Sequence, residues 1–343
     1  MKVLYILIAI LGFGFLIIVH ELGHFLVAKL FKVKIDEFSI GMGPKIVSKK
    51  GKDNVAYSLR LFPIGGYVAM EGEDGEINDD EGNFRNKPAW QRLLITFAGP
   101  LTNIVIAFII VFIIVSTNSV FGTTKVAQFV DQSTSCNAGL MIDDEIVSVD
   151  GTRVHTMTEL NYEISRKGYK PISLEVLRNG EKVTINDVTF PVDSSEGVSF
   201  GLRDFGVYPE EKAFSTIVKN AFFTSKSTIK MIWDSIYDLI SGRYSVKNVS
   251  GPIGITNTMS QAASSGAYTF FFLLAIISMN LGFMNLLPIP ALDGGSILII
   301  LIEMITRRKI PTKVEVIIKG ITFVLLLALI AVISFKDIIY LFK

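Results

Sequence analysis

The sequence predicts a multipass α-helical membrane protein with about four transmembrane helices, a membrane-associated β-hairpin region and one β-rich extracytoplasmic domain. Three observations lead to this fold class. First, 50% of the 343 residues are hydrophobic and the mean hydropathy is +0.48, which is too apolar for an ordinary soluble protein. Second, four long apolar segments each approach or exceed the roughly 18 to 20 residues that a membrane helix needs. Third, a region rich in strand and turn signals separates the second of these segments from the third.

The four apolar segments are expected to be the transmembrane helices. They are Val3 to Val19, Leu93 to Val115, Phe270 to Leu287 and Val316 to Phe335. The first is too long to be a signal peptide and has no small-residue cleavage site before His20, so we expect it to be retained. With their flanking residues, the spans are assigned to residues 1–30, 92–116, 269–305 and 314–340.

Lysine and arginine near the membrane ends predict the orientation of these spans. The loop of residues 31–91 is rich in both, whereas residues 248–306 contain neither. Four more basic residues precede the last span: Arg307, Arg308, Lys309 and Lys313. We therefore expect a protein of the cell membrane whose loop 31–91 is cytoplasmic. Both termini and the region between the second and third spans are then extracytoplasmic.

Composition excludes some partners and sites. The net charge is +1 and no basic run is interleaved with aromatic residues, so a nucleic-acid partner is not expected. The expected partners are the lipid bilayer and a protein within it. The single cysteine, Cys136, cannot form an internal disulfide, and one thiol is too few for a thiolate metal site.

Two glycine-punctuated apolar runs in the cytoplasmic loop are too short to span a membrane. They are "FSIGMGPKI" at residues 38–46 and "FPIGGYVAM" at residues 62–70, and both are typical of strands or a hairpin. An exposed strand edge at Gly65 and Gly66 could bind an unwound peptide through its backbone. An ordinary half-buried hairpin is the alternative.

The region of residues 124–206 is predicted to be a soluble unit of short strands with turns at Asp150-Gly151 and Asn179-Gly180. Its "NAGLMIDDEIVSVDGTRV", residues 137–154, is similar to a run found in bacterial PDZ domains. That resemblance implies that a peptide strand adds to a sheet edge, with its carboxylate held near "SFGLRDFGV", residues 199–207. Residues 207–268 are expected to form a linker and an amphipathic helix, which lies on the outer membrane surface or packs on the domain.

The stretch "IIVHELGHFLVAKL" places His20, Glu21 and His24 inside the first apolar span. Histidines four apart on a helix share one face and can bind one zinc ion, with the glutamate beside the water of the metal. In a soluble helix such a pair is more often a surface feature. In a membrane span unpaired polar groups are expensive, which favours a metal site. Lys29 lies five residues beyond His24, roughly 7 Å along a helix, so we expect the site in the inner leaflet.

A catalytic zinc site needs a third protein ligand. The remaining histidine of the three in the chain, His155, falls in the external region, so a carboxylate is expected instead. Asp293 is the best candidate because Pro288, Pro290 and two glycines break the apolar stretch around it, and irregular backbone at membrane depth is tolerated where it lines a cavity or is buried. A Pro/Gly turn at the membrane surface with an Asx cap is the alternative reading. Glu303 is the second choice, and could instead cap the inner end of that stretch.

Three asparagines in the apolar spans are candidate substrate-binding residues: Asn103, Asn280 and Asn285. Each could hold the backbone of a substrate or a developing oxyanion. Hydrogen bonding between helices of the bundle is an equal alternative for each of them.

The combination of "HELGH" at residues 20–24 and "NLLPIPALDGG" at residues 285–295 resembles the site-2 protease family of intramembrane zinc metalloproteases, in its bacterial RseP/RasP branch. The similarity extends to "FPIGGYVAM", "FAGPLTNIVIAF" (97–108) and "SGPIGI" (250–255). It implies a zinc ion bound by His20, His24 and Asp293, with Glu21 as general base. The implied substrate is a membrane-spanning protein already shortened by another protease, such as an anti-sigma factor or a signal-peptide remnant.

Two other classes of function are compatible with parts of the sequence. A metal transporter could use the same ligands, but it would favour several intramembrane acids and inverted repeats, and neither a repeat nor a second metal cluster is visible. A non-catalytic PDZ scaffold would require that Glu21 has no role.

Overall fold

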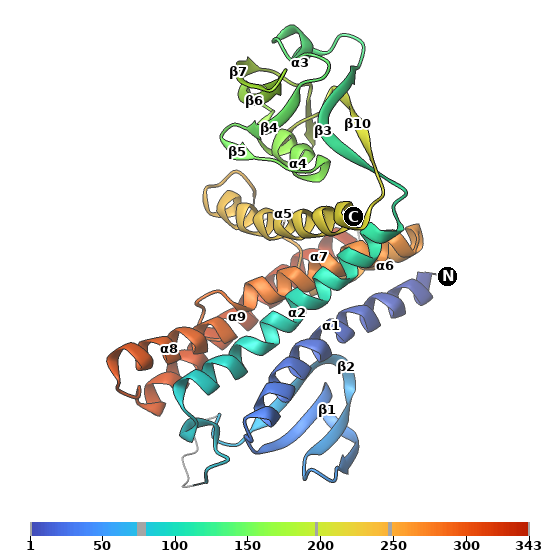
Figure 1. Cartoon of the computed structure of the whole chain (residues 1–343). Coiled ribbons are helices and arrows are strands. Elements are labelled where there is room, and N and C mark those ends of the chain that lie inside the picture. Colours follow the sequence, from blue (N-terminus) through green and yellow to red (C-terminus); the bar gives the residue numbers. More distant parts are fainter. Residues whose placement is uncertain (1, 74–79, 196–197, 246–248, 342–343) are drawn as a thin grey trace. The chain divides into compact units, whose positions relative to one another are not determined.

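The computed structural model describes residues 2–73, 80–195, 198–245 and 249–341 and divides the chain into two compact units (Figure 1). One unit combines residues 1–107 with 247–343, and the other contains residues 108–246. Each unit is described by itself below.

Within the described residues, four helices are long and apolar enough to cross a membrane, as many as the spans expected. They are α1 (Lys2–Leu30), α2 (Ala89–Thr117), α7 (Ala267–Asn285) and α9 (Thr312–Leu341). A single 3₁₀ turn, η1 (Phe84–Asn86), precedes α2, and α6 (Pro252–Ser265) precedes α7. These candidate spans, together with separate regions of β-structure, fit a membrane protein that carries a β-rich domain.

The range predicted as the third span, residues 269–305, contains two helices instead of one. After α7 ends, residues 286–292 are non-helical and α8 runs from Asp293 to Thr306. Pro288 and Pro290 lack the N–H groups that a continuous helix would need there. Gly294 and Gly295 let the start of α8 lie directly against the backbone carbonyls of residues 286–289, because a Cβ at either glycine would overlap them. The break places Asp293 at the first position of α8.

Small residues bring the helices of the first unit close together, as is common between membrane helices. A Cβ on Gly23 of α1 would lie 2.5 Å from the carbonyl oxygen of Ala98 in α2. A Cβ on Gly282 of α7 would lie 2.7 Å from the carbonyl oxygen of Pro100, also in α2. Helix α2 therefore contacts both α1 and α7 along its own backbone.

The N-terminus of α6 is capped by a side chain from the far end of the sequence. Gly251 and Gly254 each donate a backbone N–H to Oδ2 of Asp337 in α9, at 2.8 and 2.9 Å. Gly251 is the N-cap position and offers no side chain of its own, so the carboxylate of Asp337 satisfies the free amides and complements the helix dipole. This contact gives the "SGPIGI" segment a structural role at the start of α6.

The two apolar runs of the loop 31–91 form an antiparallel hairpin, as expected. Its strands are β1 (Ile35–Lys50) and β2 (Ala56–Met70). Phe38 and Val68 pack with Phe25 of α1 in a small core, so the hairpin base is anchored to the first helix. Its far end is exposed.

The second unit contains an antiparallel sheet with strand order β10-β3-β4-β6-β7, with β5 paired to β4 and a separate β8–β9 hairpin. The strands are β3 (Val120–Phe129), β4 (Glu145–Val149), β5 (Thr152–Arg153), β6 (Ile172–Arg178), β7 (Glu181–Val188), β8 (Val192–Ser195), β9 (Val198–Gly201) and β10 (Phe205–Glu211). The predicted turns form: Asp150-Gly151 and Asn179-Gly180 all have positive φ.

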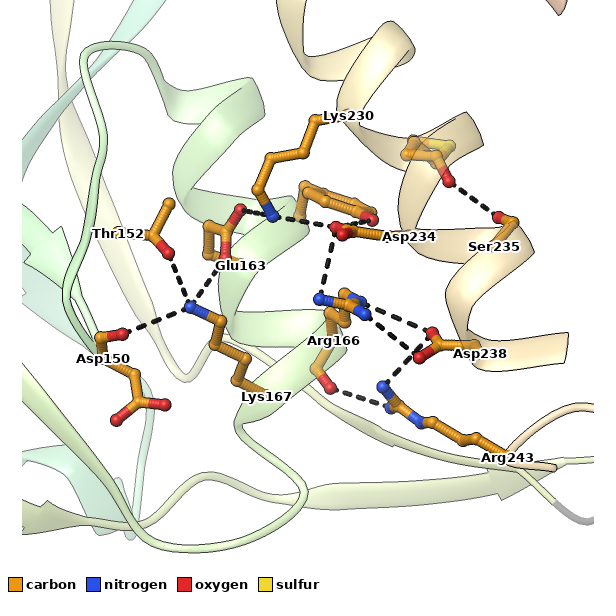
Figure 2. Close-up of polar contacts among 12 residues, drawn as sticks. Asp150, Thr152, Glu163, Arg166, Lys167, Lys230, Asp234, Ser235, Asp238 and Arg243 are labelled. Carbon is orange, nitrogen blue, oxygen red and sulfur yellow. Dashed lines mark hydrogen bonds and ion pairs between the residues drawn. The ribbon is translucent and has the colours of Figure 1, made fainter. Parts of the chain in front are cut away.

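Three helices complete the second unit: α3 (Thr134–Asn137), α4 (Met157–Lys167) and α5 (Phe214–Ile240). Helix α5, the expected amphipathic helix, packs on α4 through charged side chains (Figure 2). Lys230 of α5 bonds Glu163 of α4 at 2.7 Å, and Arg166 of α4 bonds Asp238 of α5 at 3.0 Å. Both carboxylates are buried, so the contact between the helices depends on complete charge pairing.

Candidate active site

Helix α1 and the start of α8 bring His20, His24 and Asp293 together in the first unit. Nε2 of His20 lies 3.3 Å from Nε2 of His24. Oδ2 of Asp293 lies 3.1 Å from the first of these nitrogens and 3.4 Å from the second. Within the part of the chain that the structure describes, these are the only three side chains grouped as metal ligands can be.

The donor set fits a zinc ion. Two ligands that lie about 2.0–2.1 Å from a tetrahedral zinc are separated by ~3.3–3.4 Å, close to the three separations found here. Both histidines are buried, and Oδ2 of Asp293 is buried without a hydrogen-bond donor. A buried carboxylate oxygen directed at two imidazole nitrogens is costly unless a cation satisfies it.

Helix α2 orients the two histidines. Nδ1 of His24 lies 2.8 Å from the carbonyl oxygen of Ile95 and donates its proton to it, which leaves Nε2 free to bind a metal. Nδ1 of His20 lies 3.4 Å from the side-chain amide of Asn103, which is buried at 1% exposure. The atom at this distance is Nδ2 of Asn103, while its Oδ1 is buried without a hydrogen-bond partner. Exchanging the two amide atoms would give Oδ1 a donor and would fix His20 in the same tautomer as His24.

Gly99 of α2 faces the imidazole of His24. A Cβ at this position would overlap Nε2 of His24, the nitrogen that faces Asp293. The segment "FAGP" therefore brings the backbone of α2 against a histidine of the site. No pattern within the sequence pointed to this contact, because it depends on how two distant helices pack.

Glu21 points toward strand β2. The backbone amide of Val68 donates to its carboxylate, and a Cβ on Gly66 would lie 3.5 Å from its Cγ. Gly65, with φ +92°, turns the strand in a way that residues with a side chain rarely adopt. Gly65 and Gly66 thus lie where β2 passes the glutamate.

The other predicted site residues lie as follows. Asn280 is exposed on α7 and Asn285 is half-buried at the end of that helix, and a role of either in substrate binding stays a prediction. His155 belongs to the second unit, where its ring bonds Glu159 and stacks on Phe223. Glu303 does not join the triad: it pairs with Arg92 and accepts the amide of Ile310, in line with the capping alternative.

A small polar cavity adjoins His24 and Asp293. Its volume accessible to water centres is about 40 Å³, which is room for a few waters because one needs roughly 10–15 Å³ on this measure. Among the residues that line it are Arg92, Thr96 and Ser296. The cavity therefore has room for water directly beside two residues of the triad.

Comparisons with known proteins agree on one family. A model of peptidase family M50 matches residues 8–329. A Clostridium acetobutylicum protein named as a candidate zinc metalloprotease is 38% identical over 338 residues, covering 98% of this chain and 97% of that protein. The zinc metalloprotease RasP of Geobacillus kaustophilus is 29% identical over 410 residues, covering 96% of each. The regulator of sigma-W protease RasP of Bacillus subtilis is 28% identical over 417 residues, covering 97% and 98%.

Proposed function

The chain belongs to peptidase family M50, the site-2 proteases, and is a zinc metalloprotease; from this premise we propose that it hydrolyses a peptide bond within the transmembrane segment of a membrane protein. The observation that carries the proposal is the position of the triad. His20 and His24 lie within a helix apolar enough to span a membrane, so the reacting bond has to enter the apolar layer.

His20, His24 and Asp293 are the proposed zinc ligands. A zinc ion held by them lowers the pKa of a bound water to about 7 and polarises the carbonyl of the peptide. The Ile95 carbonyl holds His24 in the tautomer that presents Nε2. Asn103 would do the same for His20 with its Oδ1 turned toward Nδ1 of that ring. We therefore propose that Asn103 orients His20 and does not bind the substrate.

Glu21 is the proposed general base. It follows His20 directly on α1 and is half-buried, so its carboxylate can accept a proton from the attacking water and pass it to the leaving amine. Hydrolysis on this scheme needs no covalent intermediate with the enzyme.

The substrate is proposed to bind as an extended strand beside β2. A helical segment keeps its backbone groups paired internally, so a peptide bond becomes accessible only after local unwinding. The Val68 amide faces Glu21, and alternation along a strand places the Gly66 amide on the same edge of β2 as the Val68 amide. That edge could pair with the unwound peptide next to the catalytic glutamate.

The proposed substrates are membrane proteins already shortened by another protease, with a membrane-bound anti-sigma factor or a signal-peptide remnant as examples. The relative in Bacillus subtilis carries the name of a sigma-W regulator, which favours the first class.

The proposed location is the cell membrane, with both termini and residues 124–206 outside and the site toward the cytoplasmic leaflet. Lys29, at the end of α1, lies on the proposed inner side, where it pairs with Asp53 at 2.6 Å.

Zinc content of single variants tests the proposed ligand set. We expect His20→Ala and His24→Ala to lose zinc and all cleavage, and Asp293→Ala to lose most of both. Glu21→Gln should keep zinc, since this carboxylate takes a proton and does not bind the ion. Full zinc occupancy in Asp293→Ala would show that another residue is the third ligand. Metal transport by Glu21→Gln would instead favour a transporter. Unchanged partner binding by this variant would favour a non-catalytic scaffold.

A further inference from the structure

Arg92 and Glu303 form a buried ion pair between two helices of the first unit. Nη2 of Arg92 lies 2.7 Å from Oε2 of Glu303, and each residue is only 6% exposed. Arg92 lies in the first turn of α2, and Glu303 lies in the last turn of α8. Neither residue is a proposed zinc ligand or the proposed base, and Arg92 lines the cavity beside His24 and Asp293.

The Glu303 carboxylate also fixes the segment that follows α8. Its Oε1 accepts the backbone amide of Ile310 at 2.8 Å, and α8 ends at Arg307 in the left-handed conformation. Both carboxylate oxygens of Glu303 are therefore engaged, one by α2 and one by the chain that leaves α8. The C-terminal end of α8 is held by directional bonds.

The two helices joined by this pair carry the parts that have to meet at the site. One turn beyond Arg92, the Ile95 carbonyl of α2 holds His24, and the next turn places Gly99 against the same ring. Helix α8 begins with Asp293 and is held there by the close approach of Gly294 and Gly295 to the preceding backbone. The ion pair holds the other end of α8. With both ends of α8 held, the orientation of this helix is fixed.

We propose that Arg92 and Glu303 are positioning residues for Asp293: their ion pair fixes α8 against α2, which holds the carboxylate within reach of His20 and His24. The inference rests on the ligand set proposed above. Apolar side chains of similar size often stabilise a fold as well as a buried ion pair does. Hydrogen bonds between a guanidinium and a carboxylate have a defined geometry, which fixes how the two helices pack, whereas apolar contacts do not.

The test compares zinc release with thermal stability in the purified full-length chain. Arg92→Met and Glu303→Met each leave a buried charge unpaired and should lower the Tm, whereas the double variant removes both charges and should recover it. We expect the double variant to release zinc to a chromogenic chelator about 10–100-fold faster than wild type, which matches the loss of metal affinity typical of changes to residues that support metal ligands. Wild-type release from a double variant with recovered Tm would overturn the proposal.

Two further variants keep the test decisive. Glu303→Asp keeps the charge but shortens the side chain by one methylene, so it should fold and release zinc at an intermediate rate, and wild-type release from it would also overturn the proposal. Arg85→Met is the matched control: it breaks another buried Arg–Glu pair, with Glu315 of α9, while Glu315 keeps Lys319 at 2.8 Å. This control should release zinc at the wild-type rate, and release as fast as from the double variant would contradict a specific role of α8.

A parallel His24→Ala measurement separates this inference from the ligand set. Retained zinc in His24→Ala would show that the proposed ligands are wrong. Lost zinc in His24→Ala together with wild-type release from the Arg92/Glu303 double variant would overturn only the positioning role.

Discussion

At the scale of single residues, Gly99 shows how a missing side chain can shape a metal site. Its Cα lies so close to His24 that a Cβ would overlap the nitrogen proposed to bind zinc. Gly99→Ala should displace this ring and weaken zinc binding about 10–100-fold, as other changes beside metal ligands do. Zinc affinity measured by competition with a chelator checks this. Gly320→Ala in α9 is the control, since nothing lies within 4 Å of a Cβ there. Wild-type affinity in Gly99→Ala would contradict the packing described.

Glu37 at the hairpin base gives a prediction for pH. Burial raises the pKa of its carboxyl, but hydrogen bonds from Ser58, Lys45, Tyr67 and Arg60 outweigh burial and lower the pKa from 4.5 to about 2. Because the folded-state pKa is lowered, the ionised carboxylate stabilises the hairpin fully above about pH 4.5. That contribution is lost as the pH falls toward 2.

Amide hydrogen exchange in β1 and β2, corrected for intrinsic rates, should therefore show protection that declines between pH 4.5 and 2. Glu37→Gln should start with less protection and show little change over this range. A flat profile in the wild-type hairpin would mean that the ion pairs of Glu37 do not stabilise it.

At the scale of elements, strand-type presentation predicts that unwinding of the substrate limits cleavage. Gly in a helix interior is about 1 kcal/mol less favourable than Ala, so replacing a Gly near the cut by Leu raises the free energy of opening by a similar amount. Such a substrate should be cleaved roughly 5-fold more slowly in kcat/KM. The same replacement at the far end of the substrate helix is the control. Equal rates for both substrates would rule out unwinding as a limiting step.

The elements also show what the sequence could and could not predict. The spacing of His20 and His24 alone predicts that they share one helix face. The prolines and glycines around Asp293, together with the lack of a third histidine near the membrane, predict that Asp293 is the third ligand. The same interruption divides the predicted third span into α7 and α8, a division that composition did not require. The contacts of Ile95, Asn103 and Gly99 with the histidines depend on the packing of α2 against α1. Sequence periodicity carries no information on such pairing between helices.

Pairing between distant charged residues was equally hidden. Glu303 was a candidate ligand because it is an acid in an apolar segment, and only its contact with Arg92 shows where its charge is balanced. Asp337 caps α6 across more than eighty residues of chain. Both contacts join segments far apart in sequence, and an acid in an apolar helix does not reveal its partner.

At the scale of the whole molecule, a filtering role of the β-rich unit for substrates is a hypothesis that a deletion can test. Deleting residues 124–206 should then allow cleavage of a full-length substrate while a pre-trimmed one is still cleaved. Rates on the two substrates, measured with the same preparation and with zinc content checked, give the comparison. An unchanged preference for the trimmed substrate would rule out a filter role of this unit.

The central claim is that zinc-dependent hydrolysis occurs within the membrane segment of the substrate, with Glu21 as the base. The most direct measurement incubates a trimmed membrane-spanning substrate with the full-length chain in liposomes and maps the new termini by mass spectrometry. Wild-type protein should cut inside the apolar segment. Glu21→Gln, with equal zinc content, should be at least ~10²-fold slower. A cut outside that segment, or a Glu21→Gln variant that cleaves at the wild-type rate, would contradict the account.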